Sequence, residues 1–109
     1  MPKAFLVIRV KLADPARREA FDDWYHREHL PDAIKAFRCE KAWRFWSETD
    51  PATHQATYRF ADRAAIDKAL ASDGFKKLIA DFDRDWPNMP RSREILTLAD
   101  ELGGFPETG

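Results

Sequence analysis

The side chains best suited to proton transfer lie close together in the chain, and His29 is the first of them. Pro31 disfavours helical geometry at Leu30, so we expect a helix to end at His29 and its imidazole to face a helix–sheet cleft. A ring with a near-neutral pKa suits general acid or base catalysis there. Alternatively, His29 only hydrogen-bonds the last helical carbonyls. Because the helix dipole favours the protonated ring, a base at this position requires burial.

Glu28 and Tyr25 are the other catalytic candidates. Glu28 shares the apolar stripe of the helix with Phe21 and Trp24, where a carboxylate costs free energy unless it is paired or protonated. We expect either an ion pair with an arginine or a cavity in which a raised pKa lets Glu28 exchange protons with a substrate. The Tyr25 hydroxyl can orient a carbonyl or a phenol. The candidate partners of Glu28 are Arg9, Arg44 and Arg59.

Aromatic residues make up 13% of the chain and include four tryptophans. They predict a pocket for a flat, apolar ligand, although core packing explains each of them equally well. Basic residues of the expected strands either clamp a carboxylate of the ligand or are exposed charges. The candidate substrate-binding residues are Trp24, Trp43, Trp46, Tyr58 and Arg59, with Lys41 and Arg44 as further candidate clamps.

Other kinds of chemistry lack good candidates. Asp22, His26 and His29 have the spacing of three metal ligands on one helix side. Tight metal sites need enclosed surroundings, so we expect a solvated Asp22–His26 pair and no metal. The glycines form no phosphate-binding loop, and the chain has no nucleophile elbow. The single cysteine, Cys39, excludes an intrachain disulfide and is expected to be inert. We predict no cofactor.

The overall composition excludes several partners. Lys and Arg total 18 against 19 Asp and Glu, so a formal charge of -1 gives no overall field for nucleic acid or an anionic membrane. No apolar run approaches the ~20 residues of a membrane helix and no signal peptide is evident, so we expect a cytoplasmic protein. A chain of 109 residues that is 44% hydrophobic predicts one folded domain, residues 1–100, and a tail, residues 101–109.

The periodicity of apolar residues predicts elements in the order βαββαβ. We expect strands at 3–12, 37–46, 55–60 and 93–98, a helix at 14–29, and helical segments that begin at 62 and 72. This order is typical of a ferredoxin-like α+β fold, with two helices on one face of a four-stranded antiparallel sheet. The other face carries Phe5, Val7 and one of Trp43 and Trp46. A homodimer formed through this face would bury the apolar patch.

One segment, residues 21–31, reads FDDWYHREHLP. This aromatic-rich helix that closes with His and Pro resembles the first-helix signature of the EthD-like proteins in the dimeric α+β barrel superfamily. Leu70-Ala71-Ser72 and Asp81-Phe82 are similar to the second-helix pattern of the same proteins. Relatives with this scaffold include monooxygenases, isomerases, polyketide cyclases, decarboxylases and proteins with no known activity.

The resemblance implies a small cofactor-independent enzyme that acts on an aromatic or polyketide-like molecule. Proton transfer by His29, with Glu28 or Tyr25, would drive isomerisation, cyclisation, decarboxylation or oxygenation. One alternative is a non-catalytic small-molecule-binding or accessory protein with the same cavity. A purely structural dimer is the other, and it requires the His29 ring to be packed around and hydrogen-bonded by local backbone.

Overall fold

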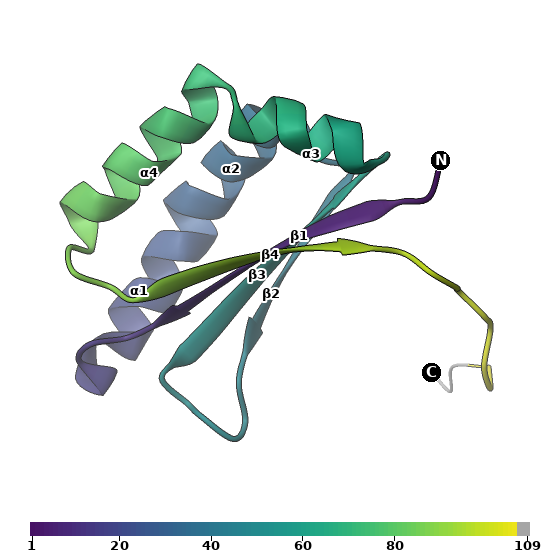
Figure 1. Ribbon diagram of the computed structural model, residues 1–109. Helices are drawn as coiled ribbons and strands as arrows, with labels where there is room; N and C mark the ends of the chain where they lie inside the picture. Colours follow the sequence, from purple (N-terminus) through teal and green to yellow (C-terminus); the bar gives the residue numbers. More distant parts are fainter. Residues whose placement is uncertain (107–109) are drawn as a thin grey trace.

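The computed structural model describes residues 1–106 as one sheet covered by a layer of helices (Figure 1). The strands are β1 (Ala4–Lys11), β2 (Lys41–Trp46), β3 (Thr53–Phe60) and β4 (Arg91–Thr97). The helical segments are η1 (Pro15–Arg17), α1 (Arg18–Trp24), η2 (Tyr25–His29), α2 (Leu30–Phe37), α3 (Arg63–Leu70) and α4 (Asp73–Asp85). Residues 98–106 lead away from the sheet (Figure 1), and the end of the expected tail, 107–109, lies outside the described residues.

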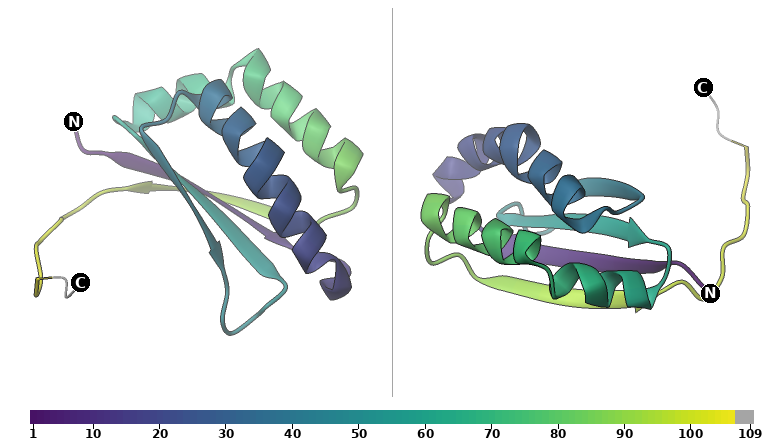
Figure 2. Two further views of the ribbon diagram at one scale, coloured as in Figure 1. Left: turned by 180° about the vertical axis from the view of Figure 1, so that it is seen from behind. Right: turned by 90° about the horizontal axis from the view of Figure 1, so that it is seen from above.

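The four strands form an antiparallel sheet in the order β2-β3-β1-β4. All the helices lie on the same face of this sheet, and α2 and α4 lie side by side (Figure 2). This is the ferredoxin-like α+β fold that the sequence predicts. None of the helices described between residues 1 and 106 has the length and apolar character needed to cross a bilayer.

The expected end of the first helix at His29 is wrong. Helical structure runs without a break from Pro15 to Phe37, and Pro31 lies in the first turn of α2, directly after η2. The preceding segment, η2, is a π-helical turn. Its wider hydrogen bonding accommodates the proline ring, which in a regular helix collides with a carbonyl of the preceding turn. The helix ends where Arg38 adopts a φ of 52°.

Strand boundaries also differ from expectation. Because the first helix extends to Phe37, β2 begins at Lys41 rather than at Phe37. β3 begins at Thr53 rather than at Gln55, and β4 begins at Arg91 rather than at Arg93. Aspartates cap the starts of two helical segments: Asp14 accepts a hydrogen bond from the backbone N–H of Ala16, and Asp62 accepts one from that of Ala65.

The core lies between the sheet and the helices, and the opposite face of the sheet is uncovered. We call this second surface the open face. It carries Trp43, whose ring lies 6.2 Å from that of Phe5, whereas Trp46 faces the helices. Phe45 and Leu96 on the open face are 50% and 42% exposed. The sheet therefore presents an apolar patch on the side that none of the helices described between residues 1 and 106 covers.

Candidate functional site

The π-helical turn decides which side chain of the first helix faces the interior. In a regular helix Glu28 would follow Phe21 on the inner stripe. A π turn contains one residue more than an α turn, so His29 takes the inner position and Glu28 is exposed. The expected position of Glu28 on the apolar stripe is therefore wrong. Its candidate partners bind other carboxylates, since Arg9 pairs with Glu94, Arg44 with Asp22 and Arg59 with Glu40.

His29 is surrounded by aromatic rings. Its imidazole stacks on Trp24, with 4.8 Å between centroids and 21° between planes. It also contacts Tyr25 at 4.8 Å and Phe82 at 5.4 Å in edge-on geometry. Burial lowers the pKa of His29 to about 4, although nearby carboxylates, Asp32 first among them, oppose the shift. The ring is therefore neutral at pH 7 and has a free nitrogen lone pair to accept a proton.

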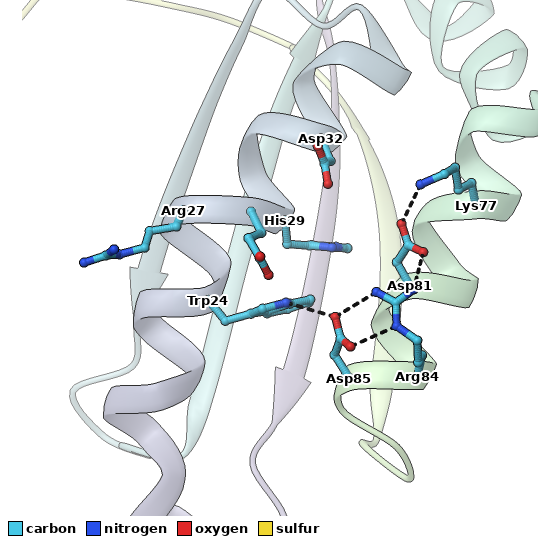
Figure 3. Close-up of a pocket in the computed structure, with 9 residues that line it drawn as sticks. Trp24, Arg27, His29, Asp32, Lys77, Asp81, Arg84 and Asp85 are labelled. Atoms are coloured by element: carbon cyan, nitrogen blue, oxygen red, sulfur yellow. Dashed lines mark hydrogen bonds and ion pairs between the residues drawn. The ribbon is translucent and has the colours of Figure 1, made fainter.

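An outer pocket of about 360 Å³ opens between the first helix and α4 (Figure 3). His29 and Trp24 line it, and the remaining lining residues are charged. Arg84 donates hydrogen bonds to both Asp81 and Asp85, and Asp85 accepts a further one from the Trp24 indole at 3.1 Å. This network fixes Trp24, and with it the surface on which His29 stacks. The charged lining residues are Arg27, Glu28, Asp32, Lys77, Asp81, Arg84 and Asp85.

His29 also lines a second, mostly apolar space, the inner cavity, whose free volume is about 30 Å³. The hydroxyls of Tyr25 and Tyr58, which line the same cavity, lie 3.2 Å apart. Burial raises the pKa of Tyr25 to about 12 and that of Tyr58 well above its ordinary value, so both hydroxyls stay protonated. The pair uses one of its two hydroxyl hydrogens internally, which leaves one to donate to a ligand.

A partly buried polar network lies beside Tyr25 and includes the buried His54, which sequence reasoning missed. Arg44 donates to His54 Nε2 at 3.0 Å and to Asp22 at 2.6 Å, and Trp46 donates to Asp22 at 2.7 Å. Burial, with Arg44 nearby, lowers the pKa of His54 to about 3. The signal was present in the sequence, because extending the alternation of Ala56 and Tyr58 by one step places His54 on the core face.

The structure brings together only some of the expected ligand-binding residues. Trp24 lines the outer pocket and Tyr58 the inner cavity, each beside His29. Trp46 lies at a separate surface pocket with Asp22. Trp43 and Arg59 lie on the open face, so they do not line the cleft that contains His29. The basic residues do not converge either: Lys41 lies over Trp43, Arg44 binds Asp22, and Arg59 binds Glu40.

Asp22, His26 and His29 do not form a metal-binding group. Asp22 binds Arg44 and Trp46 instead of the expected partner His26. The pKa of Asp22 is lowered, and the hydrogen bond from Trp46 is the largest cause. Among residues 1–106, no cluster of three His, Cys, Asp or Glu side chains has the geometry to hold a metal ion. Cys39 is half-buried, and burial raises the pKa of its thiol.

No protein-family model and no curated protein matches the chain. Several solved structures resemble it along almost its whole length. A dimeric ferredoxin-like protein from an uncultured marine organism has a TM-score of 0.72 at 18% identity, with 94% of this chain and 100% of that chain covered. SnoaB, a cofactor-independent oxygenase from Streptomyces nogalater, has a TM-score of 0.66 at 16% identity, with coverages of 95% and 100%. HapK from Hahella chejuensis has a TM-score of 0.65 at 20% identity, with coverages of 97% and 99%. These similarities establish a ferredoxin-like α+β fold.

Proposed function

We propose that this chain is a small cofactor-independent enzyme of EthD-like type that moves a proton on an aromatic or polyketide-like molecule. The main support for this proposal is the placement of His29, which is neutral and lines both an outer pocket of about 360 Å³ and a mostly apolar inner cavity. Ligand sites are typically ~300–1,000 Å³, so the outer pocket has the size for a small molecule. SnoaB, with the same fold, is a cofactor-independent oxygenase.

In this mechanism His29 removes a proton from a carbon or oxygen of the ligand. The hydroxyl pair of Tyr25 and Tyr58 donates a hydrogen bond to the ligand oxygen that gains electron density. Trp24 contacts the ring system from the outer pocket, and Glu28, exposed in its lining, exchanges the proton with water. The resulting carbanion or enolate leads to isomerisation, cyclisation, decarboxylation or reaction with dioxygen.

One observation favours the non-catalytic alternative, in which the cleft binds a small molecule without changing it. A general base works best when the pKa of its conjugate acid is near the working pH. Burial holds the pKa of His29 at about 4, which makes it a weak base unless the bound ligand stabilises the imidazolium.

Hydrogen–deuterium exchange separates the two functions without requiring the natural substrate. The probes are 2-tetralone and acetylacetone in D₂O, followed by NMR with wild type, His29→Gln and the exposed control His26→Gln. We expect wild type and His26→Gln to accelerate exchange and His29→Gln to lose about 100-fold or more of that acceleration. Equal exchange by His29→Gln excludes His29 as the base. Binding of a probe without exchange in the wild type favours the non-catalytic function.

We also propose a homodimer formed through the open face. The side chains of Phe45 and Leu96 are partly exposed on this face. A second copy of the chain would cover them with its own open face. One of the similar structures is itself a dimeric ferredoxin-like protein. The cytoplasmic location remains a prediction of the sequence.

A further inference from the structure

Arg91 of β4 is a cation placed at the lining of the mostly apolar inner cavity. Its guanidinium lies 4.9 Å from the centre of the Phe82 ring, and the same ring contacts His29 at 5.4 Å. The hydroxyl-bearing rings of Tyr25 and Tyr58 line this cavity as well. Of the described residues that line it, Arg91 alone carries a formal charge at pH 7. Sequence reasoning missed it because the last strand was expected to begin two residues later.

The position of Arg91 opposes base catalysis when the site is empty. Its positive charge lowers the pKa of His29 further, in addition to the effect of burial. After proton transfer, an imidazolium and a guanidinium would line the same mostly apolar cavity and repel each other. The arrangement becomes favourable if a negative charge forms between the two cations.

We propose that Arg91 is an oxyanion subsite, which binds the ionised oxygen of an enolisable ketone or a phenol after His29 has taken its proton. This inference rests on the proposed proton transfer at His29. In the ketone, the C–H bond breaks, an N–H bond forms on His29, and the electron pair of the C–H bond makes a C=C bond while the carbonyl electrons move onto oxygen. A neutral ligand and a neutral imidazole thus give an oxyanion and an imidazolium. Arg91 and the spare hydroxyl hydrogen of the tyrosine pair then bind the oxyanion.

The dimensions of the site indicate how such a ligand lies. A free volume of about 30 Å³ accepts an oxygen and the atoms next to it, but not an aromatic ring. The ring of the ligand therefore remains on the side of the outer pocket, where Trp24 and His29 line the wall. Only the ionised oxygen reaches past His29 toward Arg91.

Arg91 is also available to exchange its partner. Among the described residues, its ion pair is with Asp83 at 2.9 Å, and the Asp83 side chain is 56% exposed. Exposed ion pairs contribute little free energy, so a ligand oxyanion can replace this contact. Arg93 provides a matched control, because it lies on the same face of β4, over Phe75 at 5.4 Å, and does not line the inner cavity.

Binding of 4-nitrophenol tests the subsite, because its ionised and protonated forms have different absorption spectra. The full chain is titrated between pH 6 and 9, where His29 is not protonated. The carboxylates that also face His29, namely Asp32, Asp81 and Asp85, are present in every variant, so they do not cause differences between variants. We expect wild type and Arg93→Gln to bind the ionised form about tenfold more tightly than the protonated form, which lowers the pKa of the bound probe by about one unit. Arg91→Gln should abolish this preference, and Arg91→Lys should retain part of it.

Asp83→Asn is a second variant that does not depend on removing Arg91. It frees the guanidinium, so the preference for 4-nitrophenolate should increase. The subsite is refuted if wild type shows no preference or no binding, if Arg91→Gln keeps the preference, or if Asp83→Asn weakens it. If Arg91→Gln does not fold, as judged by circular dichroism, the response of Asp83→Asn decides. If the chain prefers 4-nitrophenolate but His29 is not needed for hydrogen–deuterium exchange, the proposed catalysis is refuted and the subsite is not. If exchange depends on His29 but the chain does not prefer 4-nitrophenolate, the subsite is refuted and the catalysis is not.

Discussion

The imidazole of His29 and the indole of Trp24 are stacked at 4.8 Å, and the Trp24 Nε1 donates a hydrogen bond to Asp85 of α4. The position of the candidate base thus depends on a residue of the facing helix. Arg84 links Asp85 to Asp81, so the contact is part of an ion-pair network (Figure 3). His29 consequently faces α4 and the cavities, and its neighbours differ from the backbone carbonyls that a helix-end histidine would bind.

The free energy of unfolding should fall as the pH is lowered from 7 to 5. His29 and His54 have pKa values of about 4 and 3 in the folded chain, against about 6.5 when unfolded. The unfolded state then binds more protons, so the contribution of each imidazole is present above pH 6.5 and is lost as the pH falls, by up to about 1.4 kcal/mol per pH unit. Urea titrations at several pH values measure this slope. His54→Gln should remove about half of it and the exposed control His26→Gln none; an unchanged slope in His54→Gln would contradict the prediction.

The hydroxyls of Tyr25 and Tyr58 should be energetically coupled. Tyr25→Phe or Tyr58→Phe alone leaves one buried hydroxyl without its partner, which costs about 1–3 kcal/mol. The double variant removes both polar groups and should cost clearly less than the sum of the single variants. Urea unfolding of the four proteins of this double-mutant cycle gives the coupling energy. Additive losses would show that the 3.2 Å contact contributes nothing.

Phe21→Ala should be among the most destabilising substitutions in the first helix. Phe21 is fully buried and lies 5.1 Å from the Trp86 ring and 5.3 Å from that of His54. Truncation leaves a cavity and should cost about 3–5 kcal/mol in chemical denaturation. Ile34→Ala is the control, because Ile34 is 40% exposed on the same helix. A loss of less than about 1 kcal/mol for Phe21→Ala would mean that the core assignment is wrong.

Light scattering at micromolar concentration should give twice the chain mass of 12.7 kDa. A stable interface buries about 1,600 Å² or more, and Phe45 lies within the proposed contact. Phe45→Lys should therefore shift the mass toward that of the monomer, because it places a charge in an apolar interface. Ile34→Lys introduces the same charge at an exposed apolar position on the helical side and should leave the mass unchanged. A monomeric wild type would refute the dimer.

Much of the fold is predictable from the sequence because its signals are local. The alternation along β1 separates Leu6 on the core side from Phe5 on the open face, and the register of the sheet confirms this division. Asp14 and Asp62 are caps that act on residues within three positions. Such short-range patterns fix the element order, and the element order restricts the topology.

The candidate site is less predictable because it depends on a local exception and on distant contacts. A regular helical period places Glu28 inside, and Pro31 is expected to end the helix. The π turn instead exposes Glu28, and the helix continues past Pro31. The alternation along β3 places His54 on the core face, but the side chains that His54 and Arg91 contact come from other elements. Their roles therefore follow from contacts between elements and cannot be inferred from nearby residues.

The π-helical turn is equivalent to a one-residue insertion in an otherwise regular helix. Deleting one residue from 25–29 would close the turn and rotate every preceding side chain by about 100° relative to those that follow. A related chain without the inserted residue would keep its proton acceptor two positions before the proline, but that acceptor would be one position closer in sequence to the counterpart of Phe21. Sequence alignments that count positions from Phe21 would then match the acceptor of that chain to the exposed Glu28 and miss a functional equivalence that the three-dimensional structures share.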